Sequence, residues 1–150
     1  MSEKVIYHYV FRTYKGRFIL IDKDSVDFLY TIFKEICNQK GFEILKCKIL
    51  ADHVHILLKF EPRHQIEYVM RMLKGISSRE FFKKFRTNRY EYRKLWGRSY
   101  FSEQITEEKL PALINYIENQ EKNHIDKRYM GKEPIRRGGS GSAKTNGENE

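Results

Sequence analysis

The spacing of hydrophobic residues changes along the chain, and each change predicts a new element of secondary structure. Residues 5–11 are β-branched and aromatic almost throughout and predict a strand. From Asp24 onward the apolar residues recur at helical spacing, and Gly41 follows the last of them, so we expect a helix over residues 25–40. Asp24 or Ser25 can cap its start, because a short polar side chain there accepts a hydrogen bond from a backbone N–H.

The middle of the chain predicts a hairpin followed by a second helix. Residues 42–50 and 53–60 each carry a strand-like apolar pattern, and the two residues between them suit a tight turn. Over residues 65–85 the apolar positions return to helical spacing, although Gly75 weakens the pattern of one unbroken helix. We therefore expect two strands and one helix in this region.

The last third of the chain predicts a short strand and a final helix. An irregular basic segment over residues 86–98 leads into a strand over residues 99–105. Thr106 can cap the next helix, whose first turn holds Glu107 and Glu108, and its apolar stripe continues to about His124.

The predicted order of elements is β-α-β-β-α-β-α. This is the ferredoxin-like pattern with an additional C-terminal helix. We expect a single α+β domain over residues 1–130, in which helices pack on one face of an antiparallel sheet and the other face is left for function. Residues 131–150 are basic and rich in Gly and Ser, so they predict a flexible tail that buries no core.

Composition then narrows the class of protein. The 150 residues carry 29 Lys and Arg against 20 Asp and Glu, a net charge of +9, together with 10 Tyr and 10 Phe. This charge predicts a polyanionic partner, and aromatic side chains beside basic ones are how proteins hold unpaired bases. No apolar run approaches the roughly 20 residues of a membrane span, so we expect a cytoplasmic protein without membrane association.

Candidate chemistry begins with His53 and His55, in the predicted strand over residues 53–60. Residues two apart in a strand point to the same face, so both imidazoles project together. The apolar residues that alternate with them point toward the helices, which predicts that the histidines lie on the face that the core does not need. Two imidazoles at this spacing can hold a divalent ion, or they can be surface or hydrogen-bonded histidines.

The last predicted helix offers side chains to complete such a site. Tyr116 and Gln120 are four residues apart and therefore share one helix face. A tyrosine beside a divalent ion and a basic groove can attack a DNA phosphate and form a covalent phosphotyrosine. Alternatively, Tyr116 is an amphipathic residue at the helix edge. Glu121 and His124 lie on the same helix and are alternatives to Gln120 as a ligand.

Four segments together resemble one known family. They are DHVHILL at residues 52–58, LKGISSR at 73–79, LWGRSYF at 95–101 and NYIENQ at 115–120. The chain strongly resembles the single-tyrosine HUH transposases, which are the small transposases of insertion sequences that move as single-stranded DNA. The resemblance implies that His53 and His55 are metal ligands, that Gln120 is the third ligand through its amide oxygen, and that Tyr116 is the nucleophile.

The resemblance also implies a cofactor, partners and a reaction. The ligand set suits Mg²⁺ or Mn²⁺ rather than zinc. Tyr116 would attack single-stranded DNA and leave a 5′-phosphotyrosine and a free 3′-hydroxyl, which then rejoins strands. The protein would be a homodimer in which the tyrosine helix completes the site with either subunit's histidines. It would recognise DNA hairpins at the ends of the mobile element.

Basic residues supply candidate DNA contacts. One group lies in the turn after the first strand, and the densest run lies in and after the helix over residues 65–85. Beside a DNA site such residues neutralise phosphates, whereas elsewhere they form a solvated helix face. The candidates are Arg12, Lys15, Arg17, Lys74, Arg79, Lys83, Lys84, Arg86, Arg89 and Arg93. We interpret His8, which stands between two tyrosines in the first strand, as structural.

Two other functions are open at this point. A domesticated relative would cut or bind hairpins for its host without moving an element, and the DNA that flanks its gene would distinguish it. A non-catalytic nucleic-acid-binding module would need stacking aromatics on one face of the strands over residues 5–11 and 99–105. The Lys/Arg-Gly-Phe/Tyr run typical of the RNA-recognition domain is absent, which disfavours this second alternative.

Overall fold

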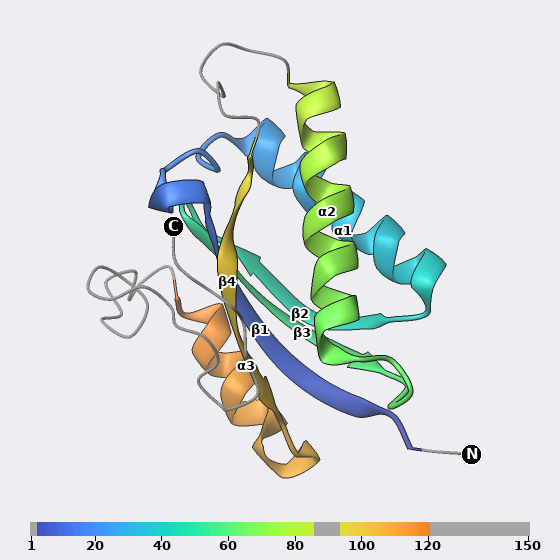
Figure 1. Cartoon of the computed structure of the whole chain (residues 1–150). Coiled ribbons are helices and arrows are strands. Elements are labelled where there is room, and N and C mark those ends of the chain that lie inside the picture. The colour runs from blue at the N-terminus through green and yellow to red at the C-terminus, as the bar shows by residue number, and fades with distance from the viewer. Residues whose placement is uncertain (1–2, 86–93, 121–150) are drawn as a thin grey trace.

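The elements follow one another in the predicted order (Figure 1). A computed structural model describes residues 3–85 and 94–120. The strands are β1 (Val5–Thr13), β2 (Glu43–Ile49), β3 (His53–Phe60) and β4 (Trp96–Gln104). The helices are α1 (Lys23–Lys40), α2 (Ile66–Lys84) and α3 (Leu110–Glu118), with short 3-10 turns η1 (Tyr14–Gly16) and η3 (Glu107–Lys109).

The first helix begins earlier than predicted because a different residue caps it. The carboxylate of Asp22 accepts hydrogen bonds from the Ser25 N–H at 3.2 Å and from the Ser25 hydroxyl at 2.8 Å. Helix α1 therefore starts at Lys23, and neither Asp24 nor Ser25 is its cap. At its other end Gly41 has a φ of 84°, a left-handed conformation that closes the helix as predicted.

Two further boundaries depend on tertiary contacts. Helix α2 runs unbroken through Gly75, because the packing of its buried face outweighs the cost of about 1 kcal/mol for a glycine relative to alanine. Strand β4 starts at Trp96, before the predicted segment over residues 99–105. Trp96 pairs with Thr13 of β1 across an irregularity in the register, which lengthens both strands.

The four strands form one antiparallel sheet in the order β2-β3-β1-β4. This confirms the ferredoxin-like α+β class. Helices α1 and α2 lie together on one face of the sheet (Figure 1). The core between these layers is apolar and includes Phe11, Phe33, Ile56, Leu73 and Trp96.

The second face of the sheet is not left open. Helix α3 lies across it, on the side opposite α1 and α2 (Figure 1). Its residue Ile117 packs with Ile6, Leu57 and Ile105 in a second apolar cluster. The prediction that helices cover one face only is therefore wrong, since the apolar stripe of α3 needs a surface to bury it and the sheet supplies that surface. Strand β3 is covered on both faces.

Ion pairs join the last elements to the sheet. Glu118 of α3 pairs with Lys46 of β2, and Glu107 of η3 lies 3.9 Å from Lys59 of β3. The side chain of Thr106 makes no capping hydrogen bond, so the predicted cap is wrong. Contacts with the sheet, rather than a cap, hold the start of this segment.

Helix α3 is also shorter than predicted. It ends at Glu118, and Gln120 lies in the turn that follows, where its N–H donates to the Ile117 carbonyl at 3.1 Å. The rest of the predicted helix, over residues 121–124, and the predicted tail over residues 131–150 lie outside the described residues. Within residues 3–85 and 94–120, no helix has the length and hydrophobicity needed to cross a membrane.

Candidate active site

Strand β3 carries the two candidate histidines onto the face that α3 covers. The ring centroids of His53 and His55 lie 5.2 Å apart. The residues that alternate with them pack against α1 and α2, as predicted. However, His53 is only 3% exposed and His55 is 0% exposed. The prediction that these histidines project from a face that no core needs is therefore wrong, because α3 packs on this face and forms a second apolar cluster there.

Hydrogen bonds hold both imidazoles by their Nδ1 atoms. Nδ1 of His53 lies 2.8 Å from Oδ1 of Asp52. Nδ1 of His55 lies 3.1 Å from Nε2 of His8, and these two rings stack with a centroid separation of 5.3 Å. His8 is 2% exposed. Because it contacts His55, it belongs to the site as well as to the structure of β1. The Nε2 atoms of His53 and His55 are buried and make no hydrogen bond with the described residues.

This pattern decides which nitrogen of each ring can bind a cation. A carboxylate only accepts, so Asp52 favours a proton on Nδ1 of His53 and leaves the lone pair on Nε2. His55 is set in the same way when Nε2 of His8 accepts its Nδ1–H. Metal-binding histidines typically donate their other ring N–H to such acceptors. The two rings are thus oriented for binding through Nε2.

Tyr116 of α3 lies beside this histidine pair. Its ring centroid is 6.3 Å from that of His55, at an interplanar angle of 83°. Tyr116 also packs against Val10, as does Phe101, the cross-strand neighbour of Val10 in β4. Because Val10 is itself the cross-strand partner of His55, the half-buried tyrosine lies over the centre of the sheet. The structure therefore brings together the predicted nucleophile and a predicted ligand.

Gln120 lies after the end of α3 rather than within the helix, but its side-chain amide is buried and could still act as a ligand. It follows the end of α3, so it does not share a continuous helical face with Tyr116. Gln120 is 0% exposed, and neither its Oε1 nor its Nε2 is hydrogen-bonded to a described residue. A buried amide in this state costs on the order of 1–3 kcal/mol, which favours a further partner for it. Its alternatives as a ligand, Glu121 and His124, lie outside the described residues.

These donors fit a divalent cation. Two imidazole nitrogens and one amide oxygen supply three ligands, and water can fill the remaining positions of Mg²⁺ or Mn²⁺. In the part of the chain that the structure describes, no group of three or more His, Cys, Asp or Glu side chains could hold a metal ion. The mixed set of His53, His55 and Gln120 stays a prediction from the resemblance to the HUH transposases, and the structure brings His53 and His55 together on one face.

Two other tyrosines of the sheet are less suited to nucleophilic attack. Tyr9 and Tyr100 pack in the core beneath α1 and α2. Burial raises the pKa of Tyr100 to about 12 and lifts the pKa of Tyr9 well above its ordinary value. The Tyr9 hydroxyl also donates to the Ile66 carbonyl at 3.1 Å. These phenols stay protonated in an apolar core, whereas Tyr116 faces the histidines.

Strand β2 brings two lysines to the site face that the sequence analysis missed. Lys48 is the cross-strand partner of His55, and Lys46 is the partner of Leu57. Directly opposed residues of neighbouring strands share a face, so both lysines lie on the side of α3. The alternation of lysines with apolar residues in this strand could have predicted that Lys46 and Lys48 share one face of the sheet. The register between β2 and β3, which shifts at an irregularity, was needed to place them beside the histidines.

The basic turn after β1 borders the other histidine. Arg12 is the cross-strand partner of His53 and therefore lies on the site face. Gly16 in the turn that follows has a φ of 65°, a left-handed conformation that favours glycine. Lys15 and Arg17, on either side of this glycine, are exposed. This predicted group of cations is therefore close to the site.

The basic residues of α2 lie on the opposite layer. Those among the predicted DNA contacts are Lys74, Arg79, Lys83 and Lys84, and Arg71 lies on the same helix. Lys74 donates to the Arg98 carbonyl at 3.3 Å, and Lys83 lies 3.6 Å from a carboxylate oxygen of Glu80. Since α2 and α3 cover opposite faces, these cations do not border the histidines, and their contact with DNA stays a prediction. Arg86, Arg89 and Arg93 lie outside the described residues.

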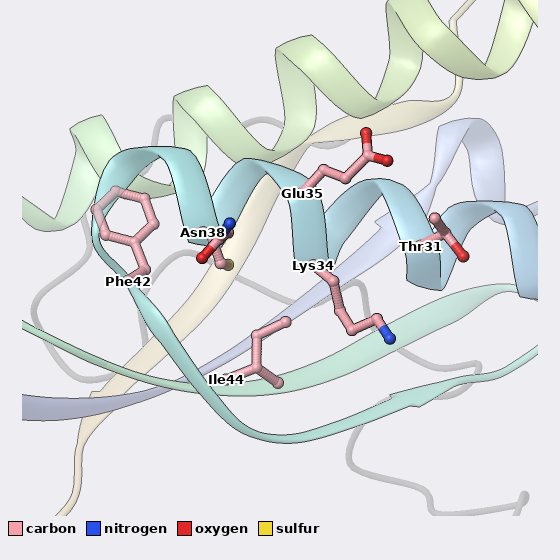
Figure 2. A pocket seen from close by; sticks show the side chains of 7 residues that line it. Thr31, Lys34, Glu35, Asn38, Phe42 and Ile44 are labelled. Carbon is pink, nitrogen blue, oxygen red and sulfur yellow. The ribbon is translucent and has the colours of Figure 1, made fainter.

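A hollow of about 430 Å³ lies between α1 and the edge strand β2 (Figure 2). Its lining includes Thr31, Lys34, Glu35 and Asn38 of α1, with Phe42 and Ile44 (Figure 2). Cys37 also lines it, and burial raises the pKa of this thiol to about 12. The hollow holds none of the candidate site residues, and we assign it no function.

Comparisons with known protein sequences identify the family of this chain. The family described as IS200-like transposases matches residues 1–120. The ISDra2 transposase TnpA of Deinococcus radiodurans is 30% identical over 108 residues, which cover 71% of this chain and 77% of the relative. The transposase of insertion sequence element IS200 from Salmonella typhimurium is 29% identical over 92 residues. That match spans 60% of this chain and only 60% of the relative's length.

Solved structures share the architecture. The crystal structure of a Deinococcus radiodurans protein assigned as a transposase has a TM-score of 0.66 and 31% identity, over 80% of this chain and 93% of its own. A REP-associated tyrosine transposase bound to a REP hairpin has a TM-score of 0.63 and 13% identity, over 82% of this chain and 70% of its own, and so shares the fold. The chain belongs to the IS200-like transposase family.

Proposed function

We propose that this protein is a transposase that cleaves and rejoins DNA with Tyr116 as its nucleophile. The observation that carries the proposal is the position of Tyr116, whose ring lies 6.3 Å from that of His55 on the sheet face where imidazoles are buried. This contact between the Tyr116 ring and an imidazole held by a further hydrogen bond supports a chemical role for the tyrosine. Membership of the IS200-like family supports a role in DNA transposition.

Dependence on a divalent metal is part of the proposal. His53 and His55 would bind Mg²⁺ or Mn²⁺ through Nε2, and Gln120 would bind it through Oε1. When bound, the cation withdraws charge from a non-bridging phosphate oxygen and makes the phosphorus easier to attack. Asp52 and His8 hold the two rings by Nδ1, so the ligands keep their orientation without the cation.

Tyr116 makes and breaks the covalent bond. Its phenolic oxygen loses a proton and attacks the phosphorus, forming a tyrosyl ester with the 5′-phosphate. The bond from phosphorus to the 3′-oxygen breaks, and that oxygen takes up a proton to become a free 3′-hydroxyl. A 3′-hydroxyl of another strand end then attacks the tyrosyl ester and releases Tyr116. No nucleotide cofactor is needed, because each step exchanges one phosphoester for another.

We propose single-stranded DNA, and DNA hairpins at element ends, as the substrate. The net charge of +9 favours a polyanion, and Arg12 and Lys48 flank the histidines on the site face. A hairpin was solved on one protein of the same fold, which supports this choice. A hairpin is large enough to reach the cations of α2 as well, while the strand to be cut lies at Tyr116. A homodimer is proposed on the resemblance to the HUH transposases.

The test is covalent capture of DNA. Incubated with single-stranded element-end DNA and Mg²⁺, the protein should form an adduct that survives a denaturing gel. Tyr116→Phe should lose the adduct and still bind the hairpin, because only the phenolic oxygen is removed. Tyr30→Phe, on the outer surface of α1, is the matched control and should keep the adduct. An undiminished adduct in Tyr116→Phe would refute the assignment, and Tyr129 would be the next candidate.

A further inference from the structure

A second hollow, of about 530 Å³, opens beside the candidate active site. It lies where the segment before α1 meets the turn between β2 and β3. Asp52 and His53 form part of its wall, so it shares two residues with the site. The rest of its lining is largely apolar, with two charged residues, and includes Phe18, Ile21, Val26, Ile49 and Leu50 together with Asp22 and Lys23. This volume lies within the range of small-ligand sites, about 300–1,000 Å³.

The rim of this hollow exposes apolar side chains to water. Among the described residues the exposed large hydrophobics are Phe18 (64%), Ile21 (63%) and Tyr30 (40%). The first two line the hollow, and Tyr30 does not. Exposed apolar groups gathered at one place beside polar residues are typical of a binding site. The hollow therefore has the features of a surface that a flat apolar group would cover.

The exposure is imposed by the fold. Between the two exposed residues, Leu20 is 2% exposed, and its N–H donates to the Ala51 carbonyl at 3.1 Å. Just before them, the Arg17 carbonyl accepts a hydrogen bond from the Thr13 hydroxyl at 2.7 Å. These anchors tie the segment to β1 and to the β2–β3 turn. They hold Phe18 and Ile21 outward at a defined place instead of letting them pack inward.

The hollow lies in line with the reacting groups. Tyr116 contacts His55, and His53 precedes His55 on the same strand, with 5.2 Å between the two rings. The hollow begins at His53 and extends over residues that precede it in the chain. The hollow therefore reaches the site at His53, next to His55 and Tyr116 along β3, while Leu20, Val26 and Ile49 of its lining pack on the α1 side of the sheet. A strand whose phosphate lies at Tyr116 and the histidines can place a neighbouring base in the hollow.

We propose that this hollow binds an unpaired nucleobase next to the scissile phosphate, stacked on Phe18. The inference rests on the proposed function and specifies the substrate as a strand with a splayed-out base. Base stacking on an aromatic side chain suits any base, because every base has a π-face. The exposed cations Lys15 and Arg17 precede Phe18 and suit the phosphates on either side of that base.

A protein partner fits the hollow less well. Stable dimers bury about 800 Å² on each subunit, whereas the exposed apolar surface here comes from only two side chains. The lining carries the carboxylates of Asp22 and Asp52, so an uncharged base rather than a phosphate suits the hollow itself. Lys15 and Arg17, outside the lining, suit the phosphates of a polyanion. The test therefore separates a nucleobase from a second copy of the chain.

The experiment is a double-mutant cycle between side chain and base. Binding of element-end single strands is measured by fluorescence anisotropy in a Tyr116→Phe background, which blocks cleavage. One strand is intact, and the others lack the base at each position around the cleavage site in turn. Phe18→Ala should weaken binding of the intact strand roughly 5- to 100-fold. It should weaken binding less than about twofold when one particular base next to the cleavage site is missing.

Controls make the outcome specific. Tyr30→Ala removes an exposed aromatic side chain away from the hollow, so it should change the affinity for neither the intact nor the abasic strands. Phe18→Tyr keeps an aromatic ring and should keep the affinity for the intact strand. An equal loss on every abasic strand, or no loss with Phe18→Ala, would overturn the proposal. Dissociation of an oligomer by Phe18→Ala in sedimentation, without base coupling in the cycle, would also overturn it and identify a subunit contact. Because binding is the readout, the two proposals can fail separately: strands that are cut in the Tyr116→Phe background would refute the nucleophile, and loss of base coupling would refute the role of the hollow.

Discussion

The two faces of the sheet bury different kinds of side chain. Under α1 and α2, residues such as Phe11, Leu58 and Trp96 form an apolar core. Under α3, the buried residues include His8, His53 and His55 beside an apolar cluster. Burial of apolar surface stabilises a fold, whereas burial of polar groups costs free energy unless they find partners.

The difference indicates that one face of the sheet stabilises the fold and the other carries the proposed chemistry. On the α3 face, hydrogen bonds from Nδ1 of His53 to Asp52 and between Nδ1 of His55 and His8 offset part of the free-energy cost of burying the imidazoles. The amide of Gln120 is buried without a hydrogen bond to a described residue. We infer that this face gives up stability to hold ligands in a set orientation, and that the face under α1 and α2 supplies the stability.

The largest expected effect comes from comparing two substitutions on β3, one on each face of the sheet. His55→Ala should lower cleavage by about 100-fold or more, because a proposed ligand is removed. Leu58→Ala, on the other face of β3, should reduce the free energy of unfolding by about 2–5 kcal/mol through the cavity it leaves. Gel-based cleavage and urea unfolding of both variants check this.

The stabilities of the same two variants can also contradict the division of roles between the two faces. His55→Ala should cost less stability than Leu58→Ala, because the imidazole is a buried polar group whose removal also removes a desolvation cost. If His55→Ala unfolds the protein while Leu58→Ala does not, the α3 face is the main source of stability. His53→Ala should behave as His55→Ala does.

The next effect concerns the contact between two imidazoles. His8→Phe keeps a flat ring but removes the acceptor for Nδ1 of His55, so the affinity for Mn²⁺ should fall about 10- to 100-fold. His8→Gln retains an acceptor and should recover part of that affinity. Mn²⁺ binding followed by electron paramagnetic resonance measures this without DNA or cleavage. Equal affinities in both variants would leave His8 with a packing role only.

A smaller effect tests which DNA each layer contacts. With a short single strand, Arg12→Ala combined with Lys48→Ala should flatten the log–log salt dependence of binding by about 0.7 for each phosphate that is no longer neutralised. Lys83→Ala combined with Lys84→Ala should flatten it only with a hairpin, because α2 lies on the opposite layer. Anisotropy titrations over a range of salt concentrations provide the slopes. A flatter slope with the short strand in the α2 variant would place the cut strand across both layers.

The smallest expected effect concerns the attachment of α3. A hydrogen bond from Lys46, and its charge, lower the pKa of Glu118 below its ordinary value of 4.5. A carboxyl with a lowered pKa stabilises the fold above that ordinary value, and the contribution disappears as the pH falls through the lower folded value. Glu118→Gln should therefore slightly lower the melting temperature at neutral pH and make no difference in acid. A constant difference across this pH range would exclude the ion pair as its cause.

Local periodicity determined much of this structure from the sequence alone. Strand and helix patterns depend on residues close in the chain, so the element order and the ferredoxin-like class were predictable. Alternation in β3 placed His53 and His55 on one face for the same reason. The pairing of Tyr116 with these histidines followed from resemblance to the HUH transposases, and the structure places the tyrosine ring beside His55.

Contacts between distant segments decided the rest. The hydrogen bond between His8 and His55 and the position of Lys48 beside His55 depend on strand register, which no single segment encodes. The burial of the histidines depends on where α3 packs, and an amphipathic stripe specifies only that some surface will cover it. In the same way, the basic residues of α2 are separated from the site because α2 and α3 pack on opposite faces of the sheet. The sequence therefore determined which residues share an element, and the tertiary structure decided which of them meet.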